Sequence, residues 1–197
     1  CCRVAGCGRP NRRLPMRNWS LFALLALSAM PALAADYVQA PGSRLAFSGT
    51  YQGEAFTGTF PGFATRLSFD PTQLANAKLD VKIPLATTVS SNNSYDSELR
   101  GAAFFDASKF PQASFTATKF RSLGGNRYAA DGQLSLHGIN KPVTLNFEWT
   151  PGASPVLTGR ASVQRLDFGI GGGQWADTKL IPNAIAISTK VVFKPAP

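Results

Sequence analysis

His137 is the single histidine in the chain, so any Ser-His-Asp or Cys-His relay has to use it as the base. It stands beside Gly138 in an expected hairpin turn, and no Gly-x-Ser-x-Gly elbow accompanies it. The cysteines are confined to the first seven residues, so a zinc or transition-metal site lacks its usual ligands. We expect His137 to be a turn or surface residue, and we predict no catalytic residue, no metal and no cofactor.

Three other groups are candidates for chemistry. Asp96 and Glu98 are two residues apart on an expected short helix, so they face different sides and are interpreted as surface charges rather than as a paired acid and base. Asp106 precedes a short turn that ends at Pro111, where we expect its oxygen to cap backbone N–H groups. The run Gly171–Gly173 lacks the helix and lysine of a phosphate-binding loop, and it is interpreted as a flexible loop at a rim.

The elements that must position these residues are strands. Apolar and polar residues alternate with period two along most of the chain after residue 36, which is typical of strands with one buried face. Segments such as 79–83 and 143–149 show the alternation most clearly. We predict about nine strands, at residues 44–48, 54–60, 63–69, 79–83, 113–121, 127–136, 143–149, 156–164 and 185–193.

Turns separate the predicted strands, and short turns imply antiparallel neighbours. Pro61-Gly62, Gly124-Gly125-Asn126 and Pro151-Gly152 each join a hairpin. Between the strands we predict one short helix at 94–100, capped by Asn93 or Ser94 and ended by Gly101. Short strands of this kind build either a two-sheet sandwich or a closed barrel, and a wall rich in phenylalanine favours a cavity only slightly over a filled core.

Three blocks resemble the YceI family. The first is Asp96-Ser97-Glu98-Leu99-Arg100-Gly101-Ala102-Ala103-Phe104-Phe105-Asp106, followed by Lys109-Phe110-Pro111 and Phe115-Thr116-Ala117-Thr118. The second runs from Asp131 to Leu145 and includes His137-Gly138, and the third is Asp167-Phe168-Gly169. The resemblance implies an all-β fold, an eight-stranded antiparallel lipocalin-like barrel with one short helix. It also implies a periplasmic protein whose apolar interior holds polyisoprenoid chains such as quinone tails.

Wall residues of such a barrel follow from the alternation, which serves a cavity lining and a solid core equally well. We expect about half of the candidates to touch a ligand, and Phe104 to plug or gate one end. The candidate wall residues are Phe47, Phe60, Phe69, Phe104, Phe115, Leu134, Leu136, Phe147, Phe168 and Trp175.

The N-terminal segment is interpreted as a leader. We expect translation to begin at Met16, with residues 1–15 as upstream read-through, and residues 16–34 to form a signal peptide, because an apolar run from Leu21 to Met30 precedes the small-residue site Ala32-Leu33-Ala34. The run is about half of the roughly 20 residues that a membrane-spanning helix needs. We therefore expect residues 35–197 to be one domain in the periplasm, without a transmembrane segment.

Charge says little about partners once the leader is set aside. Five arginines and no acidic residue precede residue 35, so the formal net charge of +9 falls to +4 for residues 35–197. The remaining lysines and arginines are scattered singly, which argues against a nucleic-acid partner. A homodimer is left open.

Three functional hypotheses remain at this point. The first is a carrier that sequesters a polyisoprenoid, quinone or other long-chain amphiphile in an apolar barrel. The second is an enzyme or redox accessory acting on a quinone or lipid, which needs polar groups that converge on the ligand head. The third is a structural or stress-related interaction protein with a filled barrel.

Overall fold

The computed structural model describes residues 35–197, and the predicted leader and its cleavage site lie outside them. Among these residues the chain forms strands and short helices, with one α-helix. The strands are β1 (Ala35–Gln39), β2 (Arg44–Tyr51), β3 (Glu54–Thr59), β4 (Ala64–Phe69), β5 (Lys78–Pro84), β6 (Val89–Ser90), β7 (Gln112–Gly124), β8 (Arg127–Leu136), β9 (Ile139–Thr150), β10 (Val156–Gln164) and β11 (Ala184–Pro195). The helices are α1 (Asp96–Arg100) and the 3-10 turns η1 (Leu74–Asn76), η2 (Leu85–Thr87), η3 (Asn93–Tyr95), η4 (Arg165–Phe168) and η5 (Gly173–Trp175).

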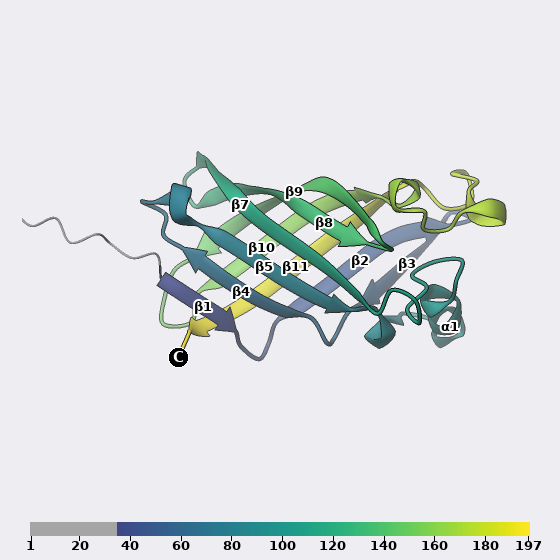
Figure 1. Ribbon diagram of the computed structural model, residues 1–197, viewed down its shortest axis with the longest axis horizontal. Helices are drawn as coiled ribbons and strands as arrows, with labels where there is room; N and C mark the ends of the chain where they lie inside the picture. The colour runs from purple at the N-terminus through teal and green to yellow at the C-terminus, as the bar shows by residue number, and fades with distance from the viewer. Residues whose placement is uncertain (1–34) are drawn as a thin grey trace, which may run out of the picture. The chain divides into compact units, whose positions relative to one another are not determined.

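The strands close into an antiparallel barrel (Figure 1). Its ring runs β1-β4-β5-β7-β8-β9-β10-β11, and β1 pairs back onto β11 to complete it. The predicted eight-stranded barrel with one short helix is therefore confirmed. Closure leaves no open edge in the ring, which removes the unpaired N–H and C=O groups of an edge strand.

β1 is the closing strand, and the alternation did not predict it. β1 and β2 lie one after the other along the same edge of β11, with Gln39 opposite Phe193 and Arg44 opposite Lys190. The bend between them is held by Ser43, whose hydroxyl donates to the carbonyl oxygens of Ala40 at 2.8 Å and Val192 at 3.3 Å. Five residues with a single buried-face aromatic, Tyr37, are too short to show a period of two.

The predicted helix is present with slightly different ends. η3 and α1 together span residues 93–100, and Gly101 follows α1 as expected. The cap differs from the prediction: Asn92, rather than Asn93 or Ser94, accepts a hydrogen bond from the backbone N–H of Ser94 at 3.0 Å. Figure 1 shows this helix beside β3 at the end of the barrel opposite the C-terminus, where β2 and β3 extend beyond the ring.

One end of the barrel is filled by aromatic rings, which we call the aromatic plug. Phe69 lies at its centre, with ring centroids of Tyr128 and Trp149 both 5.1 Å away, Phe147 5.7 Å away and Phe120 6.0 Å away. Tyr37 and Phe193 complete the plug against Trp149 at 5.5 and 6.0 Å. The plug residues are Tyr37, Phe69, Phe120, Tyr128, Phe147, Trp149 and Phe193.

Candidate functional site

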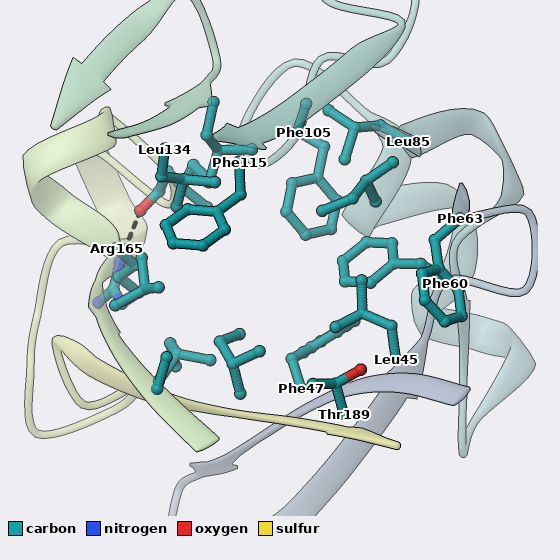
Figure 2. Close-up of a pocket in the computed structure, with 18 of the residues that line it drawn as sticks. Leu45, Phe47, Phe60, Phe63, Leu85, Phe105, Phe115, Leu134, Arg165 and Thr189 are labelled. Atoms are coloured by element: carbon teal, nitrogen blue, oxygen red, sulfur yellow. Dashed lines mark hydrogen bonds between the residues drawn. The ribbon is translucent and has the colours of Figure 1, made fainter. Parts of the chain in front are cut away.

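The rest of the barrel interior is hollow. A cavity of about 290 Å³ lies beyond the plug, and apart from a few polar groups its wall consists of phenylalanine and aliphatic side chains from strands around the ring. Figure 2 shows Phe47, Phe60, Phe105 and Phe115 directed into this space from opposite sides. Tyr95 also lines the cavity and is 42% exposed, so the cavity reaches the surface beside α1.

Glycines on the inner face let large rings lie back against the wall. A Cβ atom on Gly58 would meet the Phe47 ring at 2.2 Å, and one on Gly132 would meet the Phe115 ring at 2.8 Å. Gly58 is the cross-strand partner of Phe47. A glycine inside a strand marks a close approach of this kind, so these two pairs keep bulky rings out of the centre of the barrel.

Arg165 is the one charged group fully buried at the cavity wall among residues 35–197, with 3% of its surface exposed. Its guanidinium donates five hydrogen bonds to backbone carbonyl oxygens: those of Ile170 (3.0 Å), Gly171 (2.7 Å), Trp175 (2.8 Å), Ile181 (2.8 Å) and Pro182 (3.2 Å). Burial lowers the pKa of Arg165 from its ordinary value, yet an arginine stays protonated in proteins. The cation therefore ties the 170–182 loop to the end of β10.

Two buried polar atoms of the wall have no partner in the described part of the chain. The Thr65 hydroxyl, on a side chain that is 3% exposed, makes no hydrogen bond. The Trp175 indole nitrogen is also buried and donates to nothing. Both residues line the cavity, so each offers one polar contact to whatever occupies it.

Comparison with known proteins places this barrel in a family. Residues 37–193 match the YceI-like domain. The chain belongs to the YceI-like family. A UPF0312 protein of Vibrio campbellii is 31% identical over 179 residues, which cover 82% of this chain and 95% of that protein. A UPF0312 protein of Photorhabdus laumondii is 35% identical over 128 residues, covering 63% of this chain and 66% of that protein.

Solved structures share the fold. BcnA of Burkholderia cenocepacia superposes with a TM-score of 0.73 at 26% identity, covering 76% of this chain and 95% of BcnA. A polyisoprenoid-binding domain from Saccharophagus degradans, implicated in plant cell wall breakdown, superposes with a TM-score of 0.63 at 14% identity, covering 83% of this chain and 99% of that domain. At that identity the second likeness concerns the fold alone.

The predicted wall residues of this YceI-like barrel divide into two groups. The cavity-lining group is Phe47, Phe60, Phe104, Phe115, Leu134, Leu136 and Trp175. Phe69 and Phe147 point inward as predicted, but they belong to the plug. Phe168 is 2% exposed in η4 and does not line the cavity. Alternation predicts the inward direction of a side chain but carries no information about its depth along the barrel axis.

Sequence reasoning missed several lining residues. Phe63 was in a predicted strand whose inward positions 63, 65, 67 and 69 include it, so the signal was available. Arg165 continues the inward series of Ala161 and Val163 at the end of β10, and an arginine at such a position was not considered. Phe105 lines the cavity together with Phe104, so the predicted gating role is not confined to Phe104.

His137 is a turn residue, as predicted, but a half-buried one. It adopts a left-handed backbone (φ 54°), its ring packs 4.7 Å from Phe110, and Nδ1 lies 2.9 Å from the carbonyl oxygen of Phe168. It therefore joins the second and third family blocks. His137 is not part of the cavity wall.

The predictions for the acidic and glycine residues need correction. Asp96 is buried rather than a surface charge: the hydroxyl and backbone N–H of Ser90 both donate to it at 2.7 Å, and these bonds hold the pKa of its carboxyl below the ordinary value. Asp106 accepts from the Ser108 hydroxyl at 3.2 Å instead of capping backbone N–H groups. The Gly171–Gly173 run lies at the rim but is held rather than free, because Gly171 donates to Ala103 at 2.8 Å and accepts from Arg165.

Two further observations concern residues 35–197. Within them, no helix has both the length and the apolar character to cross a membrane. The same residues contain no group of three or more histidine, cysteine, aspartate or glutamate side chains able to hold a metal ion.

Proposed function

We propose that this protein is a binding protein that sequesters or carries one long-chain amphiphile, such as a polyisoprenoid or a quinone, with its tail in the barrel cavity. The observation that carries the proposal is a hollow of about 290 Å³ with an apolar wall, closed at one end by the plug and open beside α1. Small-molecule sites are concave and mostly apolar, with a few polar groups. The fold shared with the polyisoprenoid-binding domain of Saccharophagus degradans supports this ligand class.

Burial of the tail supplies the binding energy. Apolar surface contributes about 25 cal/mol per Å² removed from water, so a few hundred Å² contribute on the order of several kcal/mol, less the cost of ordering the chain. The wall shows no arrangement for acid-base catalysis: Thr189 donates to Arg44, and Ser90 donates to Asn92 and Asp96. Binding needs no such group, and this favours a carrier over an enzyme or redox accessory.

Export to the periplasm is part of the proposal. It rests on the leader-like residues 16–34. Mass spectrometry of the protein recovered from a periplasmic fraction checks it. A mature N-terminus at Ala35 or Asp36 supports export, and a full-length chain in the cytoplasm contradicts it.

The experiment that tests the binding function compares an inward with an outward substitution. Ala161 on β10 lines the cavity, whereas Ala186 on the neighbouring β11 is exposed. Ala161→Phe fills the hollow and Ala186→Phe adds the same ring outside. Native mass spectrometry with organic extraction, on protein expressed from the full chain, measures the bound molecule.

We expect a stoichiometric long-chain molecule in the wild type and in Ala186→Phe, and its loss in Ala161→Phe. Thermal unfolding serves as the control, because filling a cavity leaves the fold intact or stabilises it. A wild type that stays empty after incubation with quinones and polyprenols overturns the proposal and favours an interaction protein.

A further inference from the structure

The indole N–H of Trp175 is an unused hydrogen-bond donor at the cavity wall. Its nitrogen is buried and has no hydrogen-bond partner among the described residues. The great majority of buried polar side-chain atoms are hydrogen-bonded, and each exception calls for an explanation such as a missing partner molecule. An indole can only donate, so the missing partner has to be an acceptor.

The ring is held in place rather than carried on a loose loop. It packs against Phe104 at a centroid distance of 5.5 Å and against Tyr51 at 6.1 Å. The backbone oxygen of Trp175 accepts from Arg165 at 2.8 Å, and its backbone N–H donates to Gly172 at 3.1 Å. A donor fixed from these sides loses little entropy when an acceptor arrives, which is the condition for selective recognition.

The charges near this donor favour an electron-rich partner. Arg165 lies behind Trp175, and all five of its bonds go to neutral carbonyl oxygens, so its positive charge has no carboxylate partner within the described residues. Glu98 on α1 also lines the cavity. The two charges oppose each other, so a neutral carbonyl oxygen suits this end of the cavity.

We propose that the Trp175 indole N–H donates a hydrogen bond to an oxygen of the ligand's head group, which orients the amphiphile with its head at the 170–182 loop and its tail toward the aromatic plug. This inference rests on the proposed binding function and adds the chemical class of the head. The ligand is an amphiphile with an acceptor oxygen, as in a ketone, quinone, ester or acid, rather than a plain hydrocarbon.

A cycle of one protein change and one ligand change tests the hydrogen bond. Trp175→Phe keeps an aromatic ring and removes the donor. The probes are a long-chain methyl ketone and the n-alkane of the same length, and their dissociation constants are measured for wild type and variant. We expect the ketone to bind the variant about fivefold more weakly, as the net worth of one hydrogen bond predicts, and the alkane to bind both proteins equally.

The outcomes separate this inference from the function beneath it. If the variant weakens ketone and alkane by the same factor, or weakens neither, Trp175 only packs and the head-group assignment is wrong while the binding function stands. If neither probe binds the wild type, the binding function itself fails.

Fluorescence gives a second measurement that does not depend on the stability of Trp175→Phe. The chain has three tryptophans, and in the double variant Trp19→Phe/Trp149→Phe only Trp175 emits. A hydrogen bond from the indole N–H shifts its emission to longer wavelength, so saturation with the ketone should shift it relative to saturation with the alkane. Identical spectra for the two bound probes overturn the assignment.

Discussion

The two ends of the barrel interior are built from the same kinds of residue and yet differ in outcome. In the plug, Phe193 and Phe69 are 0% and 1% exposed, whereas at the cavity Phe104 and Phe115 are each 8% exposed. Phe69 meets rings from β7, β8 and β9 across the barrel, while Phe115 lies back over Gly132. What fills a barrel is therefore the partner that each ring finds across the lumen, and the abundance of rings does not decide it.

The largest expected effect compares the two ends directly. Phe69→Ala removes the ring at the centre of the plug and should lower the free energy of unfolding by about 4 kcal/mol, because the close-packed surroundings cannot collapse onto the gap. Phe115→Ala should cost about 2 kcal/mol, since one face of that ring already borders a cavity. Urea unfolding of both variants measures the difference. Equal losses would show that the hollow end is as tightly packed as the plug.

The next effect concerns what holds the hollow end open. Arg165→Met leaves five carbonyl oxygens without their donor, and it should lower the free energy of unfolding by about 3 kcal/mol or more. Arg160→Met, an exposed position on the same strand, is the matched control and should change stability by less than about 0.5 kcal/mol. A stable Arg165→Met variant would mean that the 170–182 loop keeps its place without the guanidinium.

The smallest effect concerns a polar group in the hollow end. Thr65→Val removes a buried hydroxyl that has no partner, and it should raise the free energy of unfolding by about 1 kcal/mol. Thr88→Val is the matched control, because that buried hydroxyl donates to Leu85 at 2.6 Å and its loss should destabilise by about the same amount. If Thr65→Val destabilises instead, an internal water or a bound ligand bonds to Thr65.

Much of the barrel was predictable from local pattern. Strands such as β9, where Leu145, Phe147 and Trp149 are buried between exposed neighbours, follow directly from alternation. The short helix and its end at Gly101 were predictable from the same kind of local signal. β1 was not, because its assignment depends on pairing with residues more than 150 positions away on β11.

The candidate site divides in the same way. The inward direction of Phe69 and Phe115 was predictable, but their depth was not, so one lies in the plug and the other at the cavity. The burial of Arg165 and Asp96 was missed, because each is satisfied by groups that only the fold brings close: distant carbonyl oxygens in one case, and Ser90 in the other.

The amino-acid sequence by itself determined the strand class, the inward and outward faces, and the membership in the YceI-like family, because each of these depends on residues close together along the chain. The tertiary structure decided which inward rings meet, where the barrel is hollow, and that a buried cation and an unpaired indole N–H lie at the hollow end. These features depend on distances across the lumen. Such distances are set by closure of the whole ring, which no local pattern encodes.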